Sequence, residues 1–160
     1  MTRGDGMDGL IEAIKLLRQA DFIYIIGNGG AAGMADHLAC DLLKGIGLKA
    51  ISLCSNNSLI TAIGNDYGFD EIFIEQLKTL FNPERDVLIA MSTSGNSKNA
   101  ILAAEWVQKR NGKTIVLMGR NGGALRNYST SLILIDAKDT QDCEDKIGII
   151  CHEFYKRLKE

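Results

Sequence analysis

The residues of this chain that could carry out chemistry are its two histidines, because each has a carboxylate at helical spacing. His37 and Asp41 are four residues apart, which puts both side chains on one face of a helix. Glu144 and His152 are eight residues apart, a little over two turns, so they too share a face and can converge on a common point. Imidazoles and carboxylates are the usual general acids and bases of enzymes. Two solvated helix faces would have the same spacings, and this plainer interpretation is favoured for Glu144 and His152 taken by themselves.

The first histidine follows a glycine-rich segment that is suited to bind an anion. The segment Gly27-Asn28-Gly29-Gly30 comes directly after the apolar run 22–26, which is typical of a buried strand, so the glycines fall where a strand turns into a helix. Glycines let backbone N–H groups approach a ligand, and the unpaired amides of the helix N-terminus attract negative charge. Asn28, Gly29 and Gly30 are therefore candidate binding residues, with an ordinary tight turn as the alternative.

A second unusual loop, STSGNS, spans residues 92–97 and carries the hydroxyls of Ser92, Thr93, Ser94 and Ser97. Ser97 is a suitable helix N-cap, and the plain alternative is that one hydroxyl caps while the others face water. The loop has more hydroxyls than a helix cap needs. Together with backbone amides, these hydroxyls suit a phosphate that is held without arginine or Mg²⁺. The P-loop motif of nucleoside triphosphate-binding proteins and the full dinucleotide fingerprint are absent, so the loop indicates a phosphate monoester.

The apolar periodicity predicts alternating strands and helices around these two loops. The predicted strands are residues 22–26, 49–54, 86–91, 114–118 and 132–135, and the predicted helices are residues 8–19, 31–44, 55–65, 70–80, 97–111 and 140–159. This alternation indicates an α/β three-layer sandwich with a five-stranded parallel sheet in flavodoxin-like order and a long C-terminal helix. In such folds ligands bind beyond the carboxyl ends of the strands, near the switch point, so both loops should face one crevice.

The composition restricts the class of protein. The chain is predicted to form one domain, residues 1–160, whose core needs neither disulfides nor a structural metal. The formal net charge of −2 provides no basic field for nucleic acid or membrane, so small molecules or copies of the chain are the expected partners. The N-terminus lacks a signal sequence and no apolar run could span a membrane, which predicts a cytoplasmic location. The cysteines are expected to be buried reduced thiols; they are Cys40, Cys54, Cys143 and Cys151.

Four segments of the chain resemble the sugar isomerase (SIS) domain of the sedoheptulose-7-phosphate isomerase, or phosphoheptose isomerase, type. They are GNGGAAGMADHLACDLL, SNNSLITAIGNDYGFDEIF, AMSTSGNSKNAILAA and DTQDCEDKIGIICHE, in the family's order. The resemblance implies an aldose–ketose isomerase that interconverts sedoheptulose 7-phosphate and D-glycero-manno-heptose 7-phosphate through an enediol, in heptose biosynthesis for lipopolysaccharide or capsule. It also implies that Asn28 and Asp66 line the sugar site and that the phosphate is bound by Ser92, Thr93, Ser94 and Ser97.

The resemblance further implies a metal site at the two helical pairs. In some family members the positions of His37, Asp41, Glu144 and His152 bind zinc, so Zn²⁺ is the expected cofactor. Isomerisation through an enediol needs a base at carbon and a proton shuttle at oxygen, and we assign Asp41 as base and His152 as acid, or the reverse. The metal would polarise the carbonyl. Glu144 is also a candidate substrate-binding residue.

The chain departs from the family pattern at several positions. Asp41 stands where the family has Glu, Glu144 stands where it has Gln, and the N-terminal helical segment, residues 1–20, is shorter. In the family a helical bundle in that segment supports a tetramer with sites between subunits, so a homo-oligomer is expected, either a tetramer or a dimer.

Two alternatives to this isomerase stay open. One is a non-catalytic SIS domain, either a regulator that binds a sugar phosphate or a scaffold like the replication-initiator-associating protein. The other is an isomerase of a different sugar phosphate. The chain keeps an ionisable group at all four positions of the predicted site, which favours an enzyme.

Overall fold

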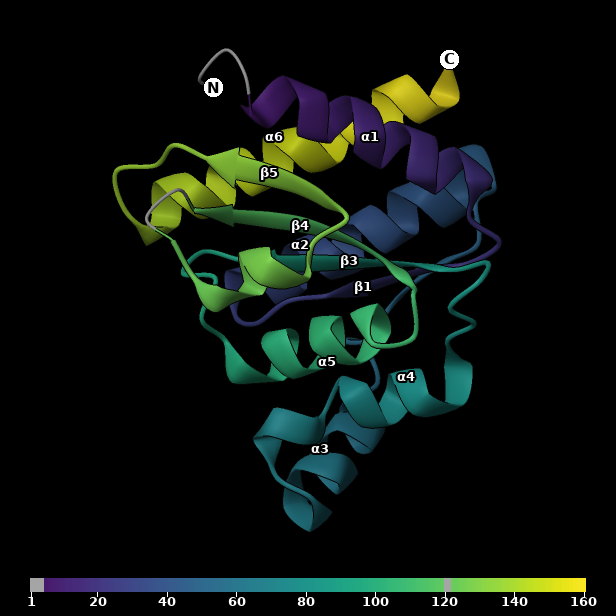
Figure 1. Cartoon of the computed structure of the whole chain (residues 1–160), viewed down its shortest axis with the longest axis vertical. Coiled ribbons are helices and arrows are strands. Elements are labelled where there is room, and N and C mark those ends of the chain that lie inside the picture. The colour runs from purple at the N-terminus through teal and green to yellow at the C-terminus, as the bar shows by residue number, and fades with distance from the viewer. Residues whose placement is uncertain (1–4, 120–121) are drawn as a thin grey trace.

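The computed structural model describes residues 5–119 and 122–160. At its centre is a parallel sheet in the order β2-β1-β3-β4-β5 (Figure 1). The strands are β1 Ile23–Ile26, β2 Ala50–Ser52, β3 Val87–Ser92, β4 Lys113–Gly119 and β5 Ser131–Ile135. All residues of β1 and β3 are buried, as expected for inner strands of a sheet that is covered on both faces. The predicted five-stranded sheet and its flavodoxin-like order are confirmed.

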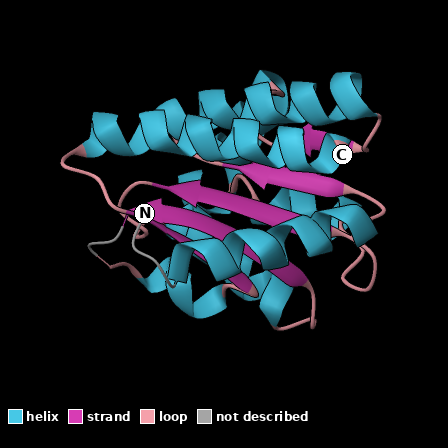
Figure 2. Cartoon of the chain, turned by 90° about the horizontal axis from the view of Figure 1, so that it is seen from above, coloured by secondary structure: helices cyan, strands magenta, loops and turns pink. Residues whose placement is uncertain are grey.

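Helices cover both faces of this sheet and form the predicted three-layer sandwich, which Figure 2 shows from above. The first face packs against α1 Asp5–Gln19, α2 Gly30–Cys40 and α6 Thr140–Lys159. The second face packs against α3 Asn57–Asp66, α4 Ile74–Leu80 and α5 Lys98–Gln108. Alternate strand residues face the two layers, because side chains along a strand point to opposite sides. Ile25 and Ile89 thus belong to the first core, and Ile26 and Leu88 belong to the second.

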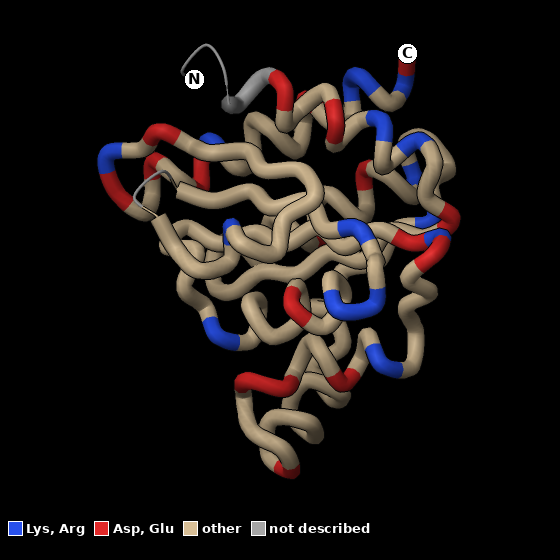
Figure 3. The backbone as a smooth tube through the Cα atoms, viewed as in Figure 1, with Lys and Arg blue, Asp and Glu red and all other residues tan. Residues whose placement is uncertain are grey.

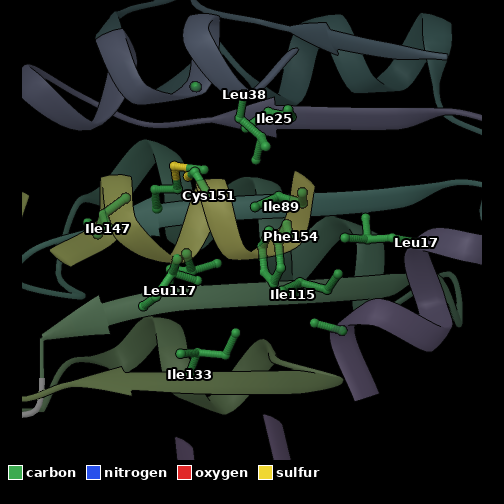
Figure 4. Close-up of a cluster of buried hydrophobic side chains, with 14 of the residues drawn as sticks. Leu17, Ile25, Leu38, Ile89, Ile115, Leu117, Ile133, Ile147, Cys151 and Phe154 are labelled. Carbon is green, nitrogen blue, oxygen red and sulfur yellow. The ribbon is translucent and has the colours of Figure 1, made fainter. Parts of the chain in front are cut away.

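The first core sets the orientation of the two helices that carry the histidines (Figure 4). Leu38 of α2 and Cys151 of α6 are both fully buried in it. Neighbouring residues of a helix point about 100° apart, so His37 and His152, which are each next to one of these buried residues, lie on the exposed side. Burying a side chain such as Leu38 contributes roughly 1.5–3 kcal/mol, so turning either helix to bury its histidine would be costly.

The structure differs from the predicted elements mainly on the second face. The helix expected at residues 55–65 begins at Asn57, because the side chain of Asn56 accepts the N–H of Leu59 at 3.0 Å as an N-cap. The helix expected at residues 70–80 is interrupted: a 3-10 helix, η2 Phe69–Glu71, precedes α4. The buried amide of Gln76 donates to the carbonyls of Leu53 and Ile72, so tertiary contacts anchor this segment to the end of β2. A second 3-10 helix, η3 Ala124–Tyr128, was not predicted from the sequence.

Charged residues of both signs are interspersed along the backbone in Figure 3. The distribution agrees with the small formal net charge of −2. None of the helices in the described parts of the chain is long and apolar enough to cross a membrane.

Candidate functional site

The loops after β1 and β3 meet at the switch point of the sheet, since β2 lies on one side of this strand pair and β4 on the other. Nδ2 of Asn28 donates to Oδ1 of Asn99 at 2.8 Å, and Nδ2 of Asn99 donates to Oδ1 of Asn28 at 3.0 Å. Asn99 is 2% exposed, and its Oδ1 also accepts the N–H of Ala100. Asn99 was not among the site residues predicted from the sequence. The available signal was a polar residue on the otherwise apolar buried face of α5.

The glycine-rich loop ends where α2 begins, and it touches α6 there. Gly29 has a positive φ of 57°, which glycine adopts without strain. A Cβ at Gly30 would collide with the carboxylate of Glu144, so this carboxylate from α6 lies directly against the start of α2. The N-terminus of a helix favours negative charge, so the position suits a carboxylate or another anion. The structure therefore brings the predicted binding residues Gly30 and Glu144 together.

The imidazoles of His37 and His152 meet between α2 and α6. Their Nε2 atoms are 3.0 Å apart, and Nε2 of His37 is 3.3 Å from Oδ2 of Asp41. Ligand atoms of these three residues all lie within 4.8 Å of one another. The side chains of His37 and Asp41 are 47% and 27% exposed, so a substrate or a metal ion has access to them. Two imidazoles and a carboxylate at these distances can hold a divalent metal or exchange protons with a ligand.

Glu144 lies outside this three-residue cluster. It lines an open groove of about 380 Å³ along α2 and α6, and His152 lines the same groove. The other lining residues are Gly30, Met34, Asp145, Gly148 and Ile149. Both ends of the predicted pair Glu144 and His152 therefore face one space, as their spacing on α6 indicated.

Asp41 begins a π-helical turn, η1 Asp41–Gly45, that continues α2. The change of hydrogen-bond pattern occurs at Asp41, whose N–H points to the carbonyls of both His37 and Leu38. The helix predicted at residues 31–44 thus extends to the expected end, but the prediction of a regular α-helix is wrong for the last turn. A Cβ at Gly45 would come within 2.5 Å of the ring of Tyr155, so this turn packs tightly against α6. Isolated π turns are frequent at functional sites.

The hydroxyl loop at residues 92–97 is ordered by its own hydrogen bonds. Oγ of Ser92 accepts the N–H of Gly95 at 3.0 Å, and Oγ of Ser94 accepts the N–H of Asn96 at 3.1 Å. Ser97 is the N-cap residue of α5, as predicted, but its side chain makes no capping hydrogen bond. Its Oγ instead lies 3.4 Å from Oγ of Ser92.

This loop forms one wall of a cavity of about 330 Å³ at the carboxyl ends of β3, β4 and β5. Thr93 and Ser94 line it on the loop side, and residues 137–140 line it at the start of α6. Polar groups at two helix starts suit an anionic ligand of modest size. Of the predicted phosphate-binding residues, Thr93 and Ser94 line this cavity, whereas Ser92 and Ser97 do not.

Asp66, predicted to line the sugar site, is not among the residues that line this cavity or the groove. It ends α3, its side chain is exposed, and its Oδ1 accepts a hydrogen bond from Asn65. Figure 1 shows α3 at the far end of the molecule from α1 and α6. Within a single chain, Asp66 therefore lines neither the space of Thr93 and Ser94 nor that of Glu144 and His152.

The cysteines do not extend the site. All four are free thiols. Burial raises the pKa of Cys151 to about 12 and also raises the pKa of Cys143, so both stay protonated at neutral pH and are unsuited as thiolate ligands. The expectation of buried thiols is wrong for Cys40, which is exposed beside the π turn, and Cys54 is half-buried.

The chain is similar to known proteins over most of its length. The family model described as the SIS domain matches residues 5–119. The phosphoheptose isomerase of Helicobacter pylori strain P12 is 41% identical over 144 residues, and the match covers 87% of this chain and 74% of that protein. The structure of a phosphoheptose isomerase from Neisseria gonorrhoeae has a TM-score of 0.88 at 33% identity, covering 94% of this chain and 85% of that one. A phosphoheptose isomerase from Francisella tularensis has a TM-score of 0.88 at 29% identity, with coverages of 94% and 84%.

Proposed function

Because this chain belongs to the SIS domain family and, within it, to the phosphoheptose isomerases, we propose that it interconverts sedoheptulose 7-phosphate and D-glycero-manno-heptose 7-phosphate. The observation that carries the proposal is the convergence of His37, Asp41 and His152 from two helices on one accessible point. A binding module would not need an acid–base group of this kind. The proposed biological role is heptose supply for lipopolysaccharide or capsule, in the cytoplasm.

The proposed reaction moves one proton between adjacent carbons. A base removes a proton from C1 of the ketose while an acid protonates the oxygen at C2, which gives an enediol. Return of a proton to C2 and loss of the proton on the C1 oxygen then give the aldose. We assign the carbon-bound proton to Asp41 and the oxygen-bound proton to His152, or the reverse. Their ligand atoms lie within 4.8 Å of each other, so both can reach neighbouring atoms of one substrate.

We propose Zn²⁺ as the cofactor, held by His37, Asp41 and His152. Two imidazoles and a carboxylate are the donor set of catalytic zinc sites that keep an open position. The observed separations of 3.0 and 3.3 Å fit this set, because ligands bonded to tetrahedral zinc at about 2.0–2.1 Å lie about 3.3 Å apart. When bound, the metal supplies polarisation of the carbonyl and stabilises negative charge that develops on oxygen.

In this proposal the remaining site residues bind the phosphate group and the sugar of the substrate. Thr93 and Ser94 bind the phosphate in the 330 Å³ cavity, with Ser92 and Ser97 beside them. Asn28, Gly29 and Gly30 border the sugar. The carboxylate of Glu144 accepts hydrogen bonds from sugar hydroxyls in the groove that it shares with His152. Ligation of the metal by Glu144 stays a prediction, since Glu144 lies outside the three-residue cluster.

We also propose a homo-oligomer, a tetramer before a dimer. The segment around Asp66 supports it, because Tyr67 and Phe69 are 67% and 61% exposed and such aromatic side chains commonly mark contact surfaces. In an oligomer this segment would reach a neighbouring subunit, and the predicted role of Asp66 at a sugar site would then be met between subunits. Light scattering after size-exclusion chromatography measures the assembly.

The isomerase activity is tested by incubating sedoheptulose 7-phosphate with metal-stripped protein, with and without added Zn²⁺, and following its conversion by NMR. We expect turnover only after Zn²⁺ is restored. Sugar-phosphate binding without turnover in either sample would overturn the proposal in favour of a non-catalytic regulator or scaffold. Faster turnover of a different ketose phosphate would overturn the assigned substrate and retain an aldose–ketose isomerase.

A further inference from the structure

The cavity beside the hydroxyl loop has a cation in its wall that the predicted phosphate site did not include. Thr93 and Ser94 line one side, and Lys138 and Thr140 line the side formed by the start of α6. Of the described residues that line the cavity, Lys138 alone is cationic. A lysine carries its charge on a flexible four-carbon stem, so the ammonium can turn to a ligand in the space beside it.

The carboxylates of Asp139 and Asp142, which follow Lys138 in the chain, form hydrogen bonds with groups other than the ammonium of Lys138. Oδ2 of Asp142 accepts the backbone N–H of Lys138 at 2.9 Å and also binds Nζ of Lys146 at 2.8 Å. The bond to Lys146 lowers the pKa of Asp142, so this acid stays ionised and paired with Lys146. Oδ1 of Asp139 accepts the N–H of Asp142 as the N-cap of α6. Within residues 5–119 and 122–160, Lys138 has no carboxylate at ion-pair distance.

The lysine nearest to the hydroxyl loop in sequence is committed to another partner. Lys98 begins α5, directly after the loop, but its Nζ lies 2.6 Å from Oδ2 of Asp70. Lys98 is therefore already paired, and Lys138 is the lysine whose charge is available at the cavity.

We propose that Lys138 binds the phosphate group of the substrate and sets the preference of this site for a dianionic phosphate monoester. The hydroxyls of Thr93 and Ser94 and the backbone amides are neutral donors, whereas a phosphate monoester carries a charge of about −1.5 to −2 at neutral pH. Lys138 supplies the compensating positive charge from the opposite wall. The identity of the phosphate ester rests on the proposed function. The presence of an anion site at Lys138 does not depend on that function.

The test compares Lys138→Met with a matched control, Lys113→Met. Methionine keeps the length and the apolar stem of lysine and removes the charge. Lys113 is also exposed, but it lies at the amino end of β4, whereas the cavity lies at the carboxyl ends of the strands. The probe is inorganic phosphate, with its Kd measured by calorimetry at fixed ionic strength, and kinetics with sedoheptulose 7-phosphate provide the second readout.

We expect Lys138→Met to raise the Kd for phosphate and the KM for the sugar phosphate about tenfold, with a much smaller change in kcat, as for loss of a charged hydrogen bond. Lys138→Arg should restore most of the affinity, and Lys113→Met should bind like the wild type. Unchanged phosphate affinity in Lys138→Met, or an equal loss in Lys113→Met, would overturn the assignment. If the wild type binds phosphate through Lys138 but does not isomerise the sugar, the proposed function fails and this assignment stands.

Discussion

Asn28 and Asn99 exchange two amide hydrogen bonds, at 2.8 and 3.0 Å, and thereby join the loop after β1 to the first turn of α5. Oδ1 of Asn99 also accepts the N–H of Ala100, and this second bond fixes the orientation of the Asn99 amide within the pair. The pair lies at the switch point of the sheet, between the glycine-rich loop and the hydroxyl loop. Asn99 is thus a positioning residue for Asn28, and both proposed halves of the substrate site depend on the same junction.

Replacing Asn99 by Ala should weaken both the fold and the activity. The change leaves the amide of Asn28 and the N–H of Ala100 without their partner, which costs about 1–3 kcal/mol of unfolding free energy for buried groups. We expect kcat/KM to fall by about tenfold to a hundredfold, because Asn28 is no longer held in place. Urea unfolding and steady-state kinetics measure the two effects. The exposed Asn127→Ala is the control, and wild-type kinetics in Asn99→Ala would contradict the positioning role.

Replacing Gly30 by Ala should disturb the site through contact with Glu144, because the new Cβ would collide with its carboxylate. We expect a loss of at least about tenfold in kcat/KM as Glu144 or the start of α2 moves. The control is Gly33→Ala on the same helix, where no atom lies within 4 Å of the added Cβ. That change should raise the unfolding free energy by about 0.5–1 kcal/mol and leave the kinetics unchanged. Equal kinetics for the two variants would contradict the importance of the Gly30–Glu144 contact.

Asp41→Asn and His152→Ala should each abolish turnover while leaving the binding of a phosphate ester largely intact, because the hydroxyl cavity does not include these residues. Turnover is followed by NMR and binding by calorimetry. Asp36→Asn, an exposed neighbour on α2, is the matched control and should retain activity. Retained activity in both Asp41→Asn and His152→Ala would refute the assigned acid and base.

If His37, Asp41 and His152 hold the metal, substitutions within this cluster should weaken Zn²⁺ binding more than substitutions outside it. His37→Ala should weaken Zn²⁺ binding more than about a hundredfold, since it removes a direct ligand, whereas Glu144→Gln should change the affinity by less than about tenfold. Competition with a chromophoric chelator measures both values. A loss in Glu144→Gln as large as that in His37→Ala would show instead that Glu144 is the fourth ligand.

The raised pKa of Cys151 predicts a decline of stability in alkali. Burial, with a smaller contribution from the charge of Asp41, raises this pKa from 9.0 to about 12. Between these values the unfolded chain has lost a proton that the folded chain keeps, so the unfolding free energy falls as pH rises, by up to about 1.4 kcal/mol per pH unit. Cys151→Ala removes this titration and should show a shallower slope in urea unfolding measured above about pH 8. Equal slopes in both proteins would contradict the prediction.

The amino-acid sequence by itself determined the layers of this protein and the location of its loops. Continuous apolar runs such as residues 87–91 predict strands buried on both faces, and the helical periodicity between such runs predicts a parallel sheet, because both patterns depend only on local geometry. The spacings of His37 with Asp41 and of Glu144 with His152 are local in the same sense, so each pair was predicted to share a helix face.

Only the tertiary structure decided how these pairs meet. The 3.0 Å approach of His37 to His152 depends on the packing of α2 against α6, which no spacing within one helix contains. The same holds for the buried partner of Asn28, for the contact of Glu144 with Gly30, and for the π turn at Asp41 that fits against Tyr155. Each is a contact between residues far apart in the chain. Such contacts depend on how separate elements pack against one another on the sheet. The residue pattern within a single helix or loop does not specify that packing.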